Sequence, residues 1–138
     1  MAASNIYITE FDRARLEGMI RSARAASDRD YEYLDRLETE LDQAHVVEPR
    51  DVRPDVVTMN SQVRLQDTQT GQSEDYVLVF PKDADAGRKQ ISVLAPMGAA
   101  LLGASVGQVV EWQVPGGRRA MRVEAVLYQP EAAGDYHL

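Results

Sequence analysis

The sequence predicts an α+β protein: an N-terminal antiparallel helical hairpin (a short coiled coil) followed by a C-terminal antiparallel sheet domain with one short helix. Residues 1–48 carry apolar side chains at helical spacing, whereas residues 49–138 carry them in alternation with polar ones. A polar, proline-flanked stretch, 48–54, separates the two patterns and is the expected domain boundary. The most apolar stretch, 91–117, is expected at the centre of the core.

Two helices are expected in residues 1–48. Thr9 is a favourable N-cap for the first, and Asp12 can face the free amides of its first turn. A second helix begins after a loop at Ser27, and Pro49 follows its end. Its apolar seam, at coiled-coil spacing, consists of Leu34, Leu37, Leu41 and Ala44. Matching stripes joined by a short loop predict a hairpin arm of about 25 Å that projects from the sheet domain.

Five strands joined as antiparallel hairpins are expected in the second part, over residues 57–65, 76–80, 91–95, 109–114 and 121–127. Residues 97–102 are small and apolar between two glycines, which predicts one or two buried helical turns packed on a curved sheet. Residues 82–89 are expected to form a solvated loop, and residues 129–138 a tail.

Composition excludes several classes of function. The chain has no cysteine, which removes disulfides and thiolate chemistry and fits a reducing, cytoplasmic compartment. His45 and His137 are the only histidines, so a histidine metal site or a catalytic triad is not expected, and His45 is expected at the surface. No apolar run is long enough to span a membrane, and the N-terminus lacks the pattern of a signal peptide. Neither a cofactor nor a metal ion is predicted.

The net charge of −7, without a cluster of basic residues, disfavours direct nucleic-acid binding and favours a basic protein surface as partner. Residues 1–48 hold six basic and eleven acidic side chains, so the hairpin carries most of the negative charge. At its expected tip, Asp28, Arg29 and Asp30 allow two interpretations. Oxygen ligands could grasp Mg²⁺ or touch a partner, but helix capping and solubility are favoured.

Four aromatic side chains of the second part also allow two interpretations. They can line a concave pocket, or they can simply pack in the core, which is favoured. These residues are Tyr76, Phe80, Trp112 and Tyr128. The sequence contains no glycine-rich phosphate loop, nucleophile motif or metal-ligand spacing, so no catalytic set is expected.

Four segments together resemble the Rnk branch of the GreA/GreB transcript-cleavage factor family. They are VVTMNS at 56–61, ISVLAPMGAALLG at 91–103, PGG at 115–117 and YQPEAAGDY at 128–136. The resemblance implies an FKBP-like domain without prolyl-isomerase activity, carrying a short coiled coil. It also implies a monomer that binds RNA polymerase at the mouth of the secondary channel and competes with Gre factors without stimulating transcript cleavage.

In Gre factors the docking loop is an Asp/Asn-Ser-Pro sequence just before the short helix. The resemblance places it at Leu94, Ala95 and Pro96 in this sequence. Only Pro96 matches, so the polymerase contact expected here, with Met97, is more apolar. At the tip, the spacing of Asp28 and Asp30 differs from the Gre Asp-x-x-Glu pair. The predicted arm is also shorter than that of Gre factors. Its tip carboxylates would therefore lie farther from the metal ion used in cleavage than the roughly 2.0–2.1 Å of a metal–oxygen bond.

Two alternatives to this noncatalytic function remain open. The tip carboxylates could stimulate transcript cleavage, as in Gre factors. The chain could instead regulate nucleoside diphosphate kinase directly, as the name of the Rnk branch suggests. Prolyl isomerisation is a more distant possibility.

Overall fold

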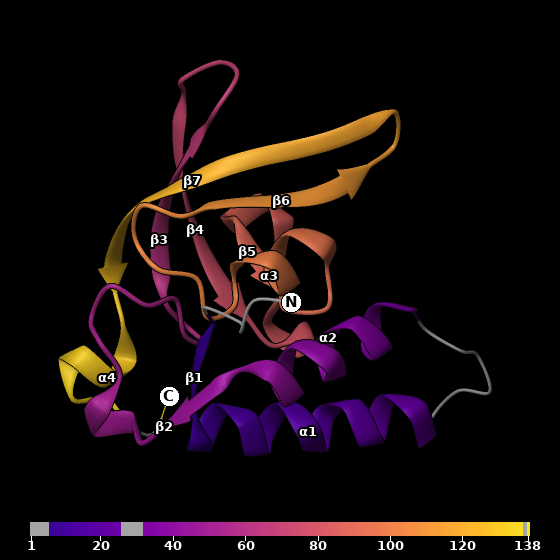
Figure 1. Cartoon of the computed structure of the whole chain (residues 1–138), viewed down its shortest axis with the longest axis vertical. Coiled ribbons are helices and arrows are strands. Elements are labelled where there is room, and N and C mark those ends of the chain that lie inside the picture. The colour runs from indigo at the N-terminus through magenta and orange to yellow at the C-terminus, as the bar shows by residue number, and fades with distance from the viewer. Residues whose placement is uncertain (1–5, 26–31, 137) are drawn as a thin grey trace.

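The computed structural model describes residues 6–25, 32–136 and 138 (Figure 1). Its helices are α1 (Glu10–Ala25), α2 (Glu32–Gln43), α3 (Pro96–Leu101) and α4 (Pro130–Ala133). Its strands are β1 (Tyr7–Thr9), β2 (His45–Val47), β3 (Gln62–Asp67), β4 (Ser73–Val79), β5 (Gln90–Ser92), β6 (Val109–Val114) and β7 (Gly117–Tyr128). The mixed α+β class predicted from the sequence is confirmed, with two long helices followed by a curled sheet. The FKBP-like description stays a prediction.

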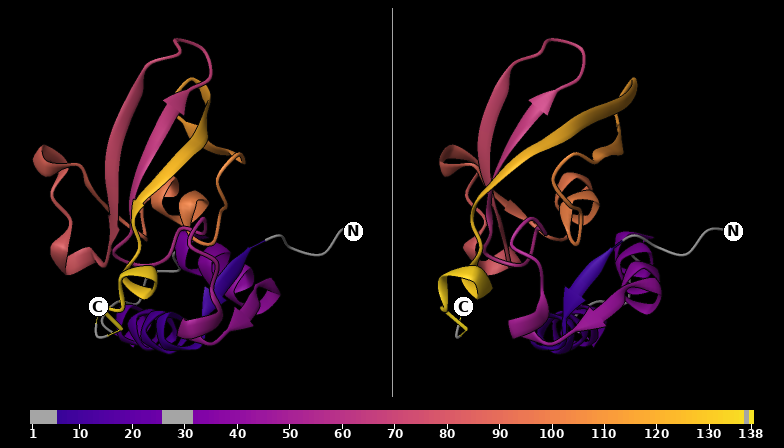
Figure 2. Two further views of the ribbon diagram at one scale, coloured as in Figure 1. Left: turned by 90° about the vertical axis from the view of Figure 1, so that its left-hand side faces the viewer. Right: turned by 60° about the vertical axis from the view of Figure 1, so that its left-hand side comes forward.

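The C-terminal sheet has five strands in the order β5-β4-β3-β7-β6. Its central strand β3 pairs antiparallel with β4 and β7, and register shifts in the β3–β7 ladder accompany its curvature (Figure 2). The expectation of purely antiparallel hairpins is wrong for β5, which pairs parallel with β4. Two 3₁₀ turns, Pro81–Asp83 and Ala86–Arg88, fold the predicted solvated loop 82–89 back along β4, so β5 starts beside the interior of β4 rather than at its end.

A small parallel pair, β1 with β2, was not predicted. The second helix ends at Gln43, and the next residues pair with the strand that precedes α1, Tyr7 opposite His45. The His45 N–H also donates to the Ile6 carbonyl at 2.9 Å. Val46 and Val47 are β-branched and favour the extended backbone that this pairing requires. Both ends of the hairpin are therefore tied together.

The predicted strand over 57–65 begins only at Gln62, so its first half is wrong. Val57 and Met59 are fully buried, which explains the apolar alternation, but the backbone between them turns. The Thr58 N–H donates to the Ser61 hydroxyl at 3.0 Å, and Asn60 adopts a left-handed φ of 68°. Local hydrogen bonds of polar side chains therefore replace strand pairing here.

The C-terminal residues 129–138 were expected to form a tail, but they contain the short helix α4. The Gln129 side chain accepts from the Ala132 N–H at 3.2 Å and caps this helix. Its amide donates to the carbonyls of Arg53 and Val56, both at 2.8 Å. Hydrogen bonds of Gln129 thus hold the start of α4 against the segment that links the helical hairpin to the sheet.

The helical hairpin forms as predicted, but it does not project freely. The apolar seam between its helices is buried, with each side chain at most 2% exposed. It consists of Leu16, Ile20, Leu34, Leu37 and Leu41. These side chains belong to the same hydrophobic cluster as the sheet residues, and both helices lie along one end of the sheet (Figures 1 and 2). Packing removes apolar surface of both parts from water, which favours the docked arrangement. A division at residues 48 and 49 stays a prediction.

The first turn of α1 is anchored to the sheet domain by Asp12. The predicted N-cap is present, since Thr9 Oγ1 accepts from the Asp12 N–H at 3.1 Å. The Asp12 carboxylate is fully buried, accepts from the Met59 N–H at 3.0 Å and is hydrogen-bonded by the Arg15 guanidinium. Burial raises the pKa of Asp12, while Arg15 and the Met59 amide oppose that rise. The carboxylate therefore joins α1 to the 58–61 turn.

Replacing Asp12 by alanine should lower the free energy of unfolding by about 2–4 kcal/mol, because the buried Met59 N–H and the Arg15 guanidinium lose their acceptor. Urea denaturation measures this loss. In the matched control, Glu17→Ala removes the exposed i,i+4 partner of Arg13 and should cost less than about 0.5 kcal/mol. Equal effects of the two substitutions would contradict the anchoring role.

Candidate functional site

The segment 94–97, predicted to contact polymerase, links β5 to α3. The Ser92 hydroxyl accepts from the Leu94 N–H at 3.1 Å, and the Ser92 carbonyl accepts from the Ala95 N–H at 3.0 Å. Pro96 then opens α3, where its missing N–H costs nothing. Pro96 is exposed, whereas Leu94, Ala95 and Met97 are half-buried. Pro96 is therefore the residue of this segment that is most available to a partner.

A glycine sets how closely this segment approaches the strand before it. A Cβ added at Gly98 would lie 2.0 Å from the Ser92 carbonyl oxygen, which is backbone and cannot move aside easily. Gly98 thus lets α3 pack directly on the end of β5. The position of Pro96 depends on this close contact.

The structure also brings α2 to this segment. A cavity of about 180 Å³ lies between them, lined by Arg36 and Glu40 of α2, by Pro96 and the alanines of α3, and by Trp112 of β6. The position of α2 beside Pro96 was not predicted from the sequence. Helical spacing could have predicted that Glu40 faces the sheet, because it lies three residues after Leu37 and next to Leu41, at the edge of the buried stripe.

Glu40 is the titratable group of this cavity with the largest perturbation. Burial raises its pKa to about 7, and the positive charge of Arg36 opposes the rise. Its Oε2 atom is buried, with no hydrogen-bond partner. A carboxylate in this setting is favoured in its neutral form, so Glu40 weakens the contact between hairpin and sheet when it ionises.

Two acidic residues of α2, Asp35 and Glu38, face solvent. Arg24 of α1 bridges them, with distances of 2.7 Å to Asp35 and 3.4 Å to Glu38, and so ties the helices together. Asp42 is exposed as well. The predicted tip residues Asp28, Arg29 and Asp30 lie outside the described residues.

The four aromatic residues have different neighbours: Phe80 and Trp112 line different cavities, and the Tyr76 hydroxyl donates to Glu74 at 2.6 Å. Trp112 is buried beside α2, whereas Phe80 lies beside α1. The Tyr128 hydroxyl donates to the Asp135 carboxylate at 2.5 Å, within the C-terminal segment. His45 is exposed, as expected, and stacks on Tyr7 with ring centroids 5.1 Å apart. These rings act in packing and local contacts.

Within the described ranges, His, Asp and Glu side chains form no group of three that could hold a metal ion. None of the described helices is long and apolar enough to cross a membrane. The surface around the segment 94–97 presents exposed Pro96 at the start of α3 and the exposed acidic side chains of α2.

Comparison with known proteins defines the class. Residues 52–128 match the family described as "Transcription elongation factor, GreA/GreB, C-term", and residues 5–47 match "Rnk N-terminus". The chain belongs to the GreA/GreB family of transcription factors, in its Rnk branch, which confirms the resemblance read from the sequence.

The particular relatives agree with this assignment. The chain is 38% identical over 139 residues to the "Regulator of nucleoside diphosphate kinase" of Escherichia coli K12, covering both proteins fully. It is 37% identical over 84 residues to "Transcription elongation factor GreA" of Alkaliphilus oremlandii, covering 61% of this chain and 53% of that protein. A solved GreA/GreB structure from Nitrosomonas europaea superposes with a TM-score of 0.74 at 40% identity, covering 89% of this chain and 98% of the other. These relatives are named as regulators and transcription factors, not as enzymes.

Glu40 should make the stability of the protein depend on pH. The folded-state pKa of Glu40 lies near 7, above the ordinary 4.5, because the folded protein favours the protonated carboxyl. The stability that this preference contributes is fully present below pH 4.5 and is lost as the pH rises through 7. Glu40→Gln should therefore flatten the fall in the free energy of unfolding between about pH 5 and pH 8, as measured by urea denaturation at each pH.

The matched control is Glu38→Gln on the exposed face of α2, which should retain the wild-type slope. Asp12 and Glu131, whose pKa values burial also raises, are present in both variants. Comparing variant with wild type thus isolates Glu40. A Glu40→Gln protein with an unchanged slope would show that ionisation of this residue is not coupled to folding.

Proposed function

We propose that this protein is a noncatalytic transcription regulator that binds RNA polymerase at the rim of the secondary channel and competes there with Gre factors. Similarity to a Gre-family regulator over the whole chain is the observation that carries the proposal. The match to the GreA/GreB C-terminal family over residues 52–128 includes the segment with Pro96. We propose further that it acts as a monomer in the cytoplasm.

The chemistry of the described surface supports this docking. Pro96 is exposed at the start of α3, with half-buried Leu94 and Met97 on either side, which offers a small apolar contact. Beside it, α2 presents Asp35, Glu38 and Asp42 to solvent. An acidic helix next to an apolar contact complements a basic channel wall, because opposite charges steer association and fix orientation.

The docked hairpin supports a role without transcript cleavage. Cleavage would require tip carboxylates to reach a metal ion deep in the channel, within about 2.0–2.1 Å. Here the Arg15 guanidinium of α1 lies over the Phe80 ring, 4.8 Å from its centroid, and Glu40 of α2 lines a cavity that Pro96 of α3 also lines. A hairpin held along the sheet domain extends less far than a free arm, so we propose that it occupies the entrance only.

Competition with a GreA factor for core RNA polymerase tests the docking. Wild-type protein should displace labelled GreA, and Pro96→Asp should weaken displacement about tenfold, because it places a charge in an apolar contact. Gln69→Asp adds the same charge in the exposed turn between β3 and β4 and should bind as wild type does. No displacement by the wild-type protein, or an equal effect of both substitutions, would contradict the proposal.

Stalled transcription complexes test the absence of cleavage. Wild-type protein and the double variant Asp28→Asn/Asp30→Asn should both leave the stalled transcript at full length, whereas GreA added in parallel shortens it. Transcript shortening that requires Asp28 and Asp30 would overturn the noncatalytic role in favour of Gre-like stimulation.

Direct regulation of nucleoside diphosphate kinase is the second candidate, suggested by the name of the relative that matches over the full chain. Co-purification separates the two. Recovery of polymerase with the tagged protein supports our proposal, whereas recovery of the kinase without polymerase supports the alternative.

A further inference from the structure

The C-terminal motif YQPEAAGDY, residues 128–136, is not used in the proposed docking. In the structure this part of the chain lies beside the segment that links the hairpin to the sheet, near the base of the hairpin (Figure 1). Its helix α4 has only four residues, and polar side chains join it to the linking segment. We therefore asked what these polar contacts hold in place.

The C-terminal residues bond to the linking segment at successive positions. Besides the two carbonyls that Gln129 contacts, Glu131 Oε1 accepts from the Thr58 hydroxyl at 2.7 Å. At the end of the chain, the Leu138 carbonyl oxygen accepts from the side-chain amide of Asn60 at 2.6 Å. The last ten residues therefore hold the linking segment over most of its length.

The Glu131 contact is part of a buried hydrogen-bonded turn. Thr58 and Ser61 are at most 1% exposed, and their hydroxyl oxygens lie 2.9 Å apart. Because a hydroxyl has one proton to donate and Thr58 gives its own to Glu131, Ser61 must be the donor between the two. Ser61 Oγ in turn accepts from the Thr58 N–H at 3.0 Å. The Glu131 carboxylate thus sets the direction of the hydrogen bonds in the 58–61 turn.

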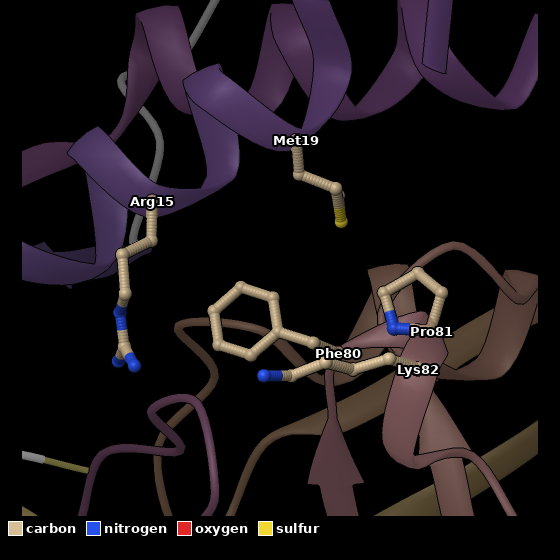
Figure 3. A pocket seen from close by; sticks show the side chains of 5 residues that line it. All are labelled: Arg15, Met19, Phe80, Pro81 and Lys82. Atoms are coloured by element: carbon tan, nitrogen blue, oxygen red, sulfur yellow. The ribbon is translucent and has the colours of Figure 1, made fainter. Parts of the chain in front are cut away.

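The same turn holds the first turn of α1. Its Met59 N–H donates to the buried Asp12 carboxylate at 3.0 Å. Asp12 also accepts from the guanidinium of Arg15, which reaches from α1 to the Phe80 ring, 4.8 Å from its centroid (Figure 3). Hydrogen bonds thus join α4 to α1 across the 58–61 turn.

Electrostatics places both carboxylates in one polar cluster. Burial raises the pKa of Glu131, the Thr58 hydroxyl opposes the rise, and the charge of Asp12 adds to it. Apolar packing is not directional, whereas hydrogen bonds are. The leucine seam can therefore hold the hairpin on the sheet, but this polar cluster selects one orientation.

The length of α1 amplifies any change at this cluster. Asp12 lies in the first turn of the helix, which has 16 residues and so extends about 24 Å. A rotation of about 10° at its base would move its far end by about 4 Å.

We propose that Glu131 is a positioning residue: from α4 it fixes the 58–61 turn, and through the bond between Met59 and Asp12 it sets the direction of the hairpin. The C-terminal residues thereby determine how α2 is presented beside Pro96. That consequence for polymerase docking rests on the proposed function, whereas the effect on the hairpin does not.

Distances between two spin labels measure the direction of the hairpin. The sequence has no cysteine, so Ser22→Cys on the exposed face of α1 and Gln69→Cys in the exposed turn between β3 and β4 would carry the only labels. With Glu131 intact, one narrow distance distribution is expected. Glu131→Ala should broaden this distribution or shift its maximum by about 4 Å. Glu131→Gln keeps an oxygen that accepts from Thr58 and should restore the wild-type distribution.

Hydrogen exchange of the Met59 amide separates a local effect from general destabilisation. In Glu131→Ala this amide should exchange about tenfold faster, whereas the hydrogen-bonded amides of the central strand β3 should keep their rates. Glu124→Ala is the matched control, because it removes an exposed carboxylate that bonds to Ser73 in the sheet, outside this cluster. It should change neither the label distance nor the exchange of Met59. Should Glu131→Ala not fold, Thr58→Val removes the other half of the bond, with the same expectations.

The proposal is overturned if loss of the bond leaves the distance distribution unchanged, if Met59 and β3 amides accelerate equally, or if Glu124→Ala has the same effect. In competition with GreA for core polymerase, Glu131→Ala should be about threefold weaker, as expected if the productive direction is populated about a third of the time. Undiminished competition would overturn the consequence for docking. Failure of the wild-type protein to displace GreA would overturn the proposed function and this consequence, but not the positioning of the hairpin, which the distances test alone.

Discussion

The hydrogen bond from the Met59 amide to the buried Asp12 carboxylate is the constraint on which the arrangement of the two parts depends. It positions the start of α1 against the 58–61 turn, and β1 just before it is held by the Tyr7 N–H, which donates to the Gly103 carbonyl at 3.3 Å. An unpaired carboxylate at this depth would be strongly unfavourable. The base of the N-terminal helices is therefore held against the sheet, and this contact determines their direction.

The parallel pairing of β4 and β5 determines what the hairpin meets. Because both strands run toward the same edge, the residues that follow them, Phe80 and Pro96, lie at the end of the sheet where the helices pack. Each helix then forms a surface with one of them. The α2 side presents Asp35, Glu38 and Asp42 to solvent together with Arg36. On the α1 side, Lys82 is exposed and Arg15 is half-buried and paired with Asp12.

Glu40 links the first of these surfaces to the packing of the hairpin. Its carboxylate borders the cavity that contains Pro96, and its pKa of about 7 reflects incomplete compensation for burial. The same end of the sheet therefore combines an anchored helix base at Asp12 with a weaker contact at Glu40, along a single hairpin.

Local patterns in the sequence determined the elements with strong periodicity. The leucine seam of α2, the cap at Thr9, the short helix after Pro96 and the alternation in β6 each follow from neighbouring residues, and so could be predicted. Long-range contacts decided the rest. Val57 and Met59 alternate as a strand does, but the turn at Asn60 satisfies the backbone there. The direction of β5, the docking of the hairpin and the neighbours of Lys82 depend on residues far apart in the chain. Periodicity records which side chains are buried, whereas only tertiary packing determines what buries them.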